Sequence, residues 1–159
     1  MELRRMFAGL GRSKAFAAFG QAMMPADRLL LRITGGRVGV GAAVGLRTLL
    51  LTTIGRTTGE PRQVPLLYVE RPPGYIVIGS NWGGERHPAW TANLLSHPDA
   101  TVSVHGRTAP VRARLLEGSE RQEMWEAVAS YWPAYDRYAE RAAHREIRVF
   151  LLEKPDHTA

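Results

Sequence analysis

Residues 52–62, with the sequence TTIGRTTGEPR, concentrate hydroxyl groups, glycines and two arginines between two apolar stretches. Gly55 and Gly59 allow backbone N–H groups to turn toward an anion, and the threonine hydroxyls can donate hydrogen bonds to it. The guanidinium groups of Arg56 and Arg62 can bind the same anion through paired N–H donors. The G-x-x-x-x-G-K-[ST] spacing of a P-loop is missing. The segment therefore predicts either an anion-binding loop or a turn that is merely polar.

A second loop of similar chemistry covers residues 79–84, GSNWGG, and leads to a predicted helix that opens at Pro88. A helix N-terminus has free N–H groups and a partial positive charge, which favour a phosphate or the negative edge of a ring. Trp82 and Trp90 lie close to this loop in the sequence. Two anion-suited loops with nearby indoles indicate a flat, polyanionic cofactor. In the alternative interpretation, Trp90 and Leu94 are one helical turn apart and simply belong to the core.

Tyr131, Tyr135 and Tyr138 follow one another at i, i+4 and i+7, so a helix would place all three phenols on one face. A stripe of this kind can be core. However, phenol tips need hydrogen-bond partners, and the charged residues between these tyrosines indicate a hydrated helix. The stripe therefore predicts either core packing or a row of phenols that faces a substrate.

Other familiar site types are not supported. His87, His97 and His105 are ten and eight residues apart, without an HxxxH or HExxH motif and without cysteine, so no metal site is predicted. Ser80 misses the G-x-S-x-G spacing of a hydrolase nucleophile by one position. The glutamates that recur every three residues over 120–126 are typical of a solvated helix face.

Composition indicates one globular domain. The 159 residues are 45% hydrophobic and 23% charged, and no stretch approaches the roughly 20 apolar residues of a membrane-spanning helix. Arg4 and Arg5 begin like a signal peptide, but glycines and further basic residues interrupt the apolar core that should follow. We therefore expect a cytoplasmic protein. Because the chain has no cysteine, cysteine usage does not indicate whether its compartment is reducing or oxidising.

The positive charge is concentrated in the first part of the chain. The net charge is +6, and residues 1–62 hold ten Lys and Arg against three Asp and Glu. Such a basic half suits nucleic acid, an anionic membrane or a strongly anionic small molecule. Because the arginines are not interleaved with aromatic residues along one stripe, no nucleic-acid partner is predicted.

The second part of the chain reads as strands joined mainly by hairpins, in the order β-β-β-α-β-β-α-β. One predicted helix follows Pro88. A second begins at a capping box formed by Ser119 and Gln122, and Pro133 bends or restarts it. The predicted fold is mainly β with helices (α+β), a six-stranded antiparallel split β-barrel. The expected strands, all short and rich in β-branched or aromatic residues, are 49–53, 64–70, 75–80, 101–105, 110–117 and 147–153.

The N-terminal part reads as helices followed by a loop. We expect two short helices broken near residues 9–11, a further helix from Pro25 to residues 35–36, and a loop over 37–45. Residues 1–24 are basic and amphipathic, so they suit either an anionic membrane or a lid on the barrel or on a second subunit. The expected organisation is an N-terminal segment 1–46, a barrel domain 47–153 and a tail 154–159.

Four stretches of the chain together resemble the deazaflavin-dependent nitroreductase family, whose members use coenzyme F420 on a split β-barrel like that of FMN-binding proteins. The likeness runs in order from about residue 27 to residue 152. The chain departs from the family pattern at Trp82, where some members carry Lys, and at Trp132, where the best-known nitroreductases carry Tyr. The stretches are LTTIGRTTGEPRQVPLLYV, GSNWGG…HPAWTANLLSHPDATV, VRARLL…ERQEMW and YWPAYDRYAER…REIRVFLLE.

The resemblance implies a role for each motif. The first loop would hold the coenzyme's phosphate and acidic tail, the second would line its path, and residues from the following helix would lie against the deazaflavin ring. Tyr135 and Tyr138 match a Y-x-x-Y segment that family members place near the substrate. The implied coenzyme-binding residues are Arg56, Thr57, Thr58, Arg62, Pro65, Asn81, Trp82, Gly83, Gly84, Pro88, Ala89, Trp90 and Asn93.

These expectations define an F420-dependent oxidoreductase. A hydride would pass from the reduced coenzyme to a small electron-poor acceptor such as a quinone, an enone or a nitroaromatic, with Tyr135, Tyr138 or water completing the protonation. The alternatives are FMN-dependent oxidoreduction on the same barrel, or a protein that carries the deazaflavin without turnover. A homodimer is compatible with this fold.

Overall fold

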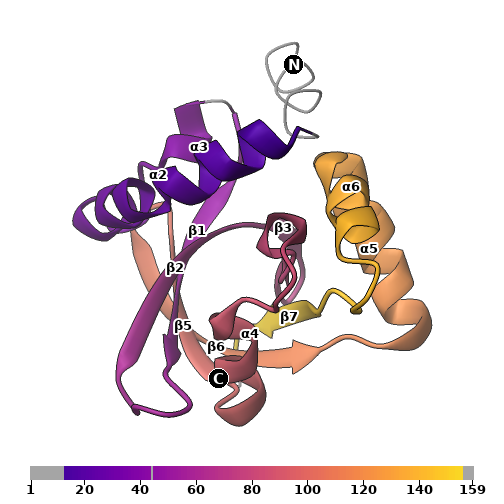
Figure 1. The fold of residues 1–159 in the computed structure, drawn as a ribbon. Helices are drawn as coiled ribbons and strands as arrows, with labels where there is room; N and C mark the ends of the chain where they lie inside the picture. Colours follow the sequence, from indigo (N-terminus) through magenta and orange to yellow (C-terminus); the bar gives the residue numbers. More distant parts are fainter. Residues whose placement is uncertain (1–12, 44, 156–159) are drawn as a thin grey trace.

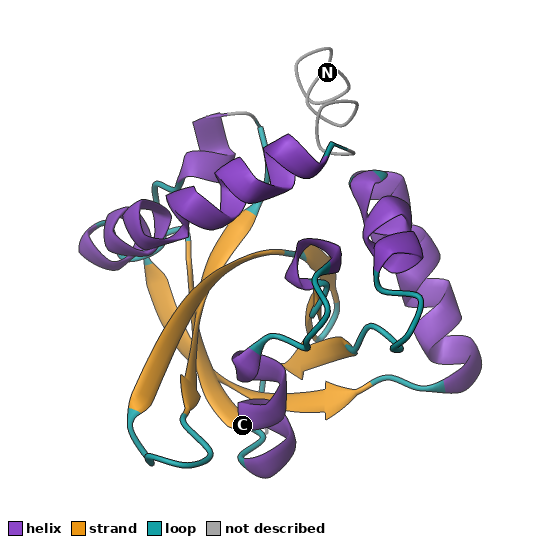
Figure 2. Ribbon diagram, viewed as in Figure 1, coloured by secondary structure: helices purple, strands orange, loops and turns teal. Residues whose placement is uncertain are grey.

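The computed structural model describes residues 13–43 and 45–155 of the chain (Figure 1). These residues form a curled, fully antiparallel sheet with helices packed around it (Figure 2). In the described part of the chain the strands are β1 (Thr48–Ile54), β2 (Pro61–Leu67), β3 (Val69–Arg71), β4 (Gly74–Ile78), β5 (Asp99–Val104), β6 (Arg107–Leu115) and β7 (Val149–Glu153).

The strand order explains why the sheet is curled. It runs β2-β1-β5-β6-β7-β4-β3, so β2 and β3 lie at opposite ends of the order. Only Tyr68 separates these two strands in the sequence. The sheet must therefore bend until its two ends meet, and β2 does contact β4. The predicted antiparallel split β-barrel is confirmed.

The number of strands differs from the prediction. The expected strand 64–70 divides at Tyr68, so the described chain has seven strands instead of six. Leu67 is the last residue to pair with β1, and Val69 already pairs with Ile76 of β4. Tyr68 is 1% exposed and meets Tyr75 edge to face at 5.2 Å between ring centroids. Because apolar residues continue through this buried corner, the sequence shows no break there.

The N-terminal helix also differs from the prediction. Helix α2 (Lys14–Ile33) is continuous, whereas we expected a helix to begin at Pro25. Its start is set by Ser13, whose Oγ accepts the Phe16 N–H at 3.0 Å. Pro25 lies on the exposed side of the helix, where its ring meets solvent and the missing N–H removes a single hydrogen bond. The break expected near residues 9–11 lies outside the described residues.

The expected loop 37–45 contains a short helix, α3 (Val40–Ala43). Its first N–H, that of Val40, donates to Oδ1 of Asp27 in α2 at 2.6 Å. The carboxyl group of a distant residue thus takes the place of a local cap, which is why the sequence around residue 40 did not reveal the helix.

The remaining helices are close to the prediction. They are η1 (Asn81–Gly83), α4 (Ala89–Ser96), α5 (Gly118–Tyr131) and α6 (Ala134–Arg141), and Pro133 separates α5 from α6 as expected. The capping box of Ser119 and Gln122 is wrong. The N-cap of helix α5 is Glu117, two residues before Ser119, and Gln122 donates to Glu126 instead. Among the described residues, no helix has the length and hydropathy needed to cross a bilayer.

Two apolar clusters share the central strands. One fills the barrel and consists mainly of residues from β1, β4, β5, β6, β7 and α4. The other lies between the outer face of β4 and β7 and helices α5 and α6. Tyr75 and Val77 belong to the first cluster, and Ile76 and Ile78 to the second. Strand β4 is thus buried on both faces, which explains its continuous apolar run.

Replacing Gly36 should test how closely the end of α2 approaches the sheet. Gly36 has φ +82°, and a Cβ there would lie 2.6 Å from the Ser103 carbonyl oxygen of β5. Gly118 also has a positive φ, but open space surrounds its Cβ position. We expect Gly118→Ala to lower the free energy of unfolding by about 1 kcal/mol, and Gly36→Ala by roughly 3 kcal/mol or more, in urea titrations. Equal losses would contradict this close approach.

Candidate functional site

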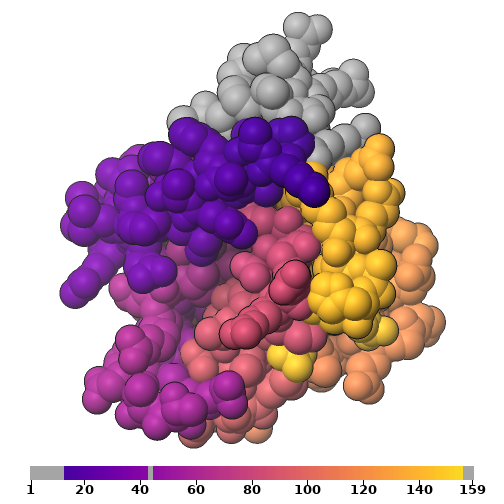
Figure 3. Space-filling model, viewed as in Figure 1, coloured from indigo at the N-terminus to yellow at the C-terminus, as the bar shows by residue number. Residues whose placement is uncertain are grey.

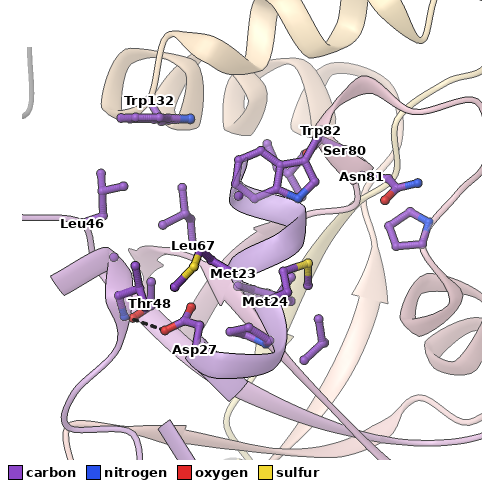
Figure 4. Close-up of a pocket in the computed structure, with 18 of the residues that line it drawn as sticks. Met23, Met24, Asp27, Leu46, Thr48, Leu67, Ser80, Asn81, Trp82 and Trp132 are labelled. Carbon is purple, nitrogen blue, oxygen red and sulfur yellow. Dashed lines mark hydrogen bonds between the residues drawn. The ribbon is translucent and has the colours of Figure 1, made fainter. Parts of the chain in front are cut away.

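A pocket of about 270 Å³ lies beneath α2, and we call it the α2 pocket. Helix α2 lies across this part of the barrel in the space-filling view (Figure 3). Met23 and Met24 of α2, Leu67 of β2 and Trp132 line the pocket, so much of the lining is apolar (Figure 4). Phe16 of α2 also lines it and lies 6.3 Å from Trp132 between ring centroids. The predicted site residues that line the α2 pocket are Pro65, Asn81, Trp82, Pro88, Trp90, Tyr135 and Tyr138.

The arginine loop, residues 55–62, lies at the other end of the β1–β2 hairpin from α2 (Figure 1). Gly55 N–H donates to the Glu60 carbonyl at 2.8 Å, and Gly59 N–H donates to the Gly55 carbonyl at 2.7 Å. Arg56 and Arg62 are exposed, and within residues 13–43 and 45–155 neither forms an ion pair. Both guanidinium groups therefore have donors available for an external anion. Thr57 and Thr58 are exposed in the same loop.

Asn93 fixes the arginine loop to α4. Its Oδ1 accepts the Arg56 backbone N–H at 3.1 Å, and its Nδ2 donates to Thr53 Oγ1 at 3.0 Å. Asn93 is 5% exposed, and it is not among the residues that line the α2 pocket. Pro88 and Trp90, at the start of the same helix, do line it. Helix α4 therefore joins the pocket wall to the anion-suited loop.

Residues 81–83 form a turn in which three successive residues are left-handed, and we call it the left-handed turn. The φ angles are 47° at Asn81, 56° at Trp82 and 78° at Gly83. The Trp82 indole packs edge to face on Tyr138, with 5.9 Å between ring centroids. Gly83 and Gly84 shape this turn, and Ala89 is exposed; none of these three is part of the pocket lining.

The tyrosine stripe divides between two environments. Tyr135 and Tyr138 are buried and line the α2 pocket, whereas the Tyr131 hydroxyl accepts the Arg47 N–H at 2.7 Å elsewhere. Burial raises the pKa of both pocket tyrosines, and at Tyr138 a hydrogen bond from the Trp132 side chain opposes the increase. Both phenols are thus protonated at neutral pH and can donate. Among the described residues, no hydrogen-bond partner is found for the Tyr135 hydroxyl.

Sequence reasoning missed Asp27, the one charged residue in the lining of the α2 pocket among the described residues. One carboxyl oxygen accepts the Val40 N–H, and the other points into the pocket (Figure 4). Burial raises the pKa of this carboxyl group, and the hydrogen bond from Val40 partly opposes the increase. A signal was present in the sequence, because Asp27 is the only acidic residue between Glu2 and Glu60.

The glutamates predicted to form a solvated helix face do so. Glu120 and Glu123 are exposed and pair with Arg114 and Arg71. In the described part of the chain, no three His, Asp or Glu side chains come together as a set of metal ligands.

Comparison with known proteins identifies the family. The family model of the F420H(2)-dependent quinone reductases matches residues 29–154. The chain belongs to this family. The predicted F420-dependent oxidoreductase is therefore confirmed, and coenzyme F420 is its redox cofactor.

Individual relatives of this F420-dependent reductase agree with the assignment. A candidate F420H(2)-dependent quinone reductase of Mycobacterium tuberculosis is 31% identical over 116 residues, which cover 73% of this chain and 97% of the relative. Another F420H(2)-dependent quinone reductase of that species is 29% identical over 79% of this chain and 85% of its own. The solved F420-H2 dependent reductase FDR-A has 34% identity and a TM-score of 0.62, and the match covers 67% of this chain and 94% of that one.

The site of this reductase suits the coenzyme chemically. F420 has an anionic phosphodiester and γ-glutamyl tail at one end and a flat deazaflavin at the other. The arginine loop offers two guanidinium groups without ion pairs among the described residues, and the α2 pocket offers aromatic walls. Strand β2 runs from the loop to the pocket. The residues present therefore fit both ends of the molecule.

Replacing Asp27 by asparagine should change how the stability of the reductase depends on pH. A carboxyl group whose pKa is raised by folding binds more protons in the folded state, so it makes stability fall as pH rises from its ordinary pKa to the raised value. The asparagine side chain cannot ionise but keeps an oxygen that accepts the Val40 N–H. We expect the urea midpoint of the Asp27→Asn variant to rise relative to that of the wild type as the pH increases above about 4. Parallel pH profiles would show that Asp27 does not titrate in this range.

Proposed function

We propose that the chain is a quinone reductase whose acceptor binds in the α2 pocket against the deazaflavin ring of F420, with the anionic tail of the coenzyme on the arginine loop. The observation that supports this proposal most strongly is the composition of the α2 pocket. Its walls are apolar and aromatic, and two protonated phenols line them. A quinone has a flat apolar ring with two carbonyl oxygens, so it matches the walls and the phenol donors together. The relatives named above are quinone reductases by name.

The coenzyme-binding roles are assigned by position along β2 and α4. In the arginine loop, Arg56, Thr57, Thr58 and Arg62 would bind the phosphate and the acidic tail. The left-handed turn would border the path between this loop and the α2 pocket. When bound, F420H2 supplies the hydride. The residues assigned to the ring and its path are Pro65, Asn81, Trp82, Gly83, Gly84, Pro88, Ala89, Trp90 and Asn93, with Asn93 acting through its hold on Arg56.

The protein's own groups would orient the acceptor and handle a proton. Reduction of a quinone to a hydroquinone takes up one hydride and one proton. Tyr135, whose hydroxyl has no partner among the described residues, can donate a hydrogen bond to an acceptor oxygen. The final proton comes from Tyr135, from Tyr138 or from water. An acceptor bound against the apolar walls would displace water from them, which would strengthen these hydrogen bonds. Enones and nitroaromatics would be reduced in the same place.

Assembly is a separate proposal. Helix α2 exposes Phe19, Leu29 and Ile33, which are 61%, 58% and 69% exposed. One solved relative, 33% identical over 79% of this chain and 94% of its own, with a TM-score of 0.64, is a domain-swapped dimer. We infer that this chain also forms a homodimer. Contact of residues 1–24 with an anionic membrane is the competing proposal for the N-terminal segment.

Removing the two loop arginines should weaken F420 binding. Charge-assisted hydrogen bonds contribute about 1.5–3 kcal/mol each, with less at exposed sites, so Arg56→Ala with Arg62→Ala should raise the Kd for F420 by at least about 30-fold. Added salt should weaken the wild-type complex. Titration of purified protein with oxidised F420 beside FMN, FAD and NADPH measures this. The double variant Arg107→Ala and Arg112→Ala, two exposed arginines of β6, is the control. Tight FMN binding without F420 binding would overturn the assignment.

Removing the Tyr135 hydroxyl should slow turnover without unfolding the protein. We expect Tyr135→Phe to lower kcat with a quinone by about tenfold or more, while the melting temperature and the Kd for F420 stay nearly unchanged. Tyr138→Phe should also lower turnover but should cost stability, because the Trp132 indole loses its acceptor. Tyr131→Phe is the matched control, because its hydroxyl bonds to Arg47 outside the pocket. If Tyr135→Phe mainly lowers stability, the residue serves the core.

A further inference from the structure

The left-handed turn has a conformation that needs support from outside. Asn81 and Trp82 have φ angles of 47° and 56°, and a left-handed residue other than glycine costs about 1–2 kcal/mol. Such a conformation persists only where surrounding contacts determine it. Within the turn, the Asn81 amide donates to the Arg86 carbonyl at 3.0 Å. Two backbone bonds also close the turn, from the Gly83 N–H to the Ser80 carbonyl at 2.9 Å and from the Gly84 N–H to the Asn81 carbonyl at 2.8 Å. All three bonds lie within the loop that follows β4, so none of them ties the turn to another element.

Arg145, in the link between α6 and β7, provides contacts from outside this loop. Its Nη2 donates to the Ser80 carbonyl at 2.8 Å and to the Gly84 carbonyl at 2.9 Å. Its Nε donates to the Gly84 carbonyl at 3.1 Å. Ser80 and Gly84 immediately precede and follow the turn. One planar guanidinium group therefore holds together the two ends of the left-handed segment.

The third nitrogen of the Arg145 guanidinium group, Nη1, is directed at His87. Nη1 lies 3.3 Å from His87 Nδ1, and because a guanidinium can only donate, Nδ1 accepts and the imidazole proton is on Nε2. Burial lowers the pKa of His87, and the nearby Arg148, Arg145 and His144 lower it further, which keeps the ring neutral. In the described chain, Arg145 pairs with no carboxylate. Its N–H groups therefore donate to the loop and not to a carboxylate.

The turn held by Arg145 carries Trp82 over the α2 pocket (Figure 4). The Trp82 indole fits between Tyr138 and Gly20 of α2, where a Cβ on Gly20 would overlap the ring. Trp82 therefore closes the space between the barrel and the helix above it. If the turn relaxed to ordinary φ values, the indole would leave this position and the pocket would open on that side.

We propose that Arg145 is a positioning residue that holds the left-handed turn so that Trp82 closes the α2 pocket around the acceptor. Its effect on the acceptor rests on the proposed function, whereas its effect on Trp82 does not. The planar fork of Arg145 bonds carbonyls on both sides of the turn, and a lysine ammonium lacks this geometry. The guanidinium shape is thus required as well as the charge.

The test compares Arg145→Gln and Arg145→Lys with the control Arg121→Gln. Arg121 is also half-buried and donates to a backbone carbonyl, that of Ile147 at 2.7 Å, but it does not contact the turn. The first measurement is acrylamide quenching of Trp82 fluorescence in coenzyme-free protein, obtained by subtracting the matching Trp82→Phe protein. The second is kcat and KM for a soluble quinone at saturating F420H2.

Arg145→Gln should make Trp82 more accessible to the quencher and raise KM by about tenfold, with kcat changed much less, because a binding wall is lost. For Arg145→Lys, both the quenching of Trp82 and the KM should lie between those of Arg145→Gln and the wild type. If Arg145→Gln does not fold, Arg145→Lys alone provides the test. Arg121→Gln should lose stability without either effect. Unchanged quenching in both Arg145 variants, or the same changes in Arg121→Gln, would overturn the proposal. If the wild type reduces no quinone, the proposed function fails, and the quenching still decides the role of Arg145.

Discussion

The single residue between β2 and β3 constrains the whole architecture. The two strands occupy opposite ends of the strand order, yet Tyr68 alone connects them, so the sheet has to close on itself. The Tyr68 side chain is buried at this corner against Tyr75. Closure gives the barrel an interior that apolar residues of β1, β4, β5, β6 and β7 fill. It also leaves β2 and β4 close together along the line where the sheet meets itself.

The site follows from this closure. Helix α2 packs on β1 and β2, while the turn that leaves β4 packs on α6. The α2 pocket lies between these two packing units, and Trp82 reaches from one to the other at Gly20. Elements far apart in sequence therefore contribute to one cavity. Arg145, in the link after α6, is bonded to the loop after β4 for the same reason.

The sequence predicted the fold through local patterns and missed what depends on distant partners. Pro88 precedes α4 and Pro133 separates α5 from α6 as expected, because proline acts on its own neighbours. Pro25 does not, because the packing of α2 outweighs one missing hydrogen bond. The cap of α3 comes from Asp27, thirteen residues earlier, and no local motif announces it. The same limit applies to the site, where the glycine-rich loops were visible in sequence but Asp27 and Arg145 were not.

The described structure separates the exposed arginines from the pocket in which we propose that the acceptor binds. Among the described residues, no lysine, arginine or histidine lines the α2 pocket. Burial keeps the two tyrosines there neutral. Burial also raises the pKa of Asp27, which favours its neutral form. The exposed guanidinium groups of Arg56 and Arg62 lie in the arginine loop at the far end of β2. In the proposed arrangement, an anionic tail is therefore attracted to one end of β2 and a neutral ring to the other, so a long molecule with both features would bind in one direction only.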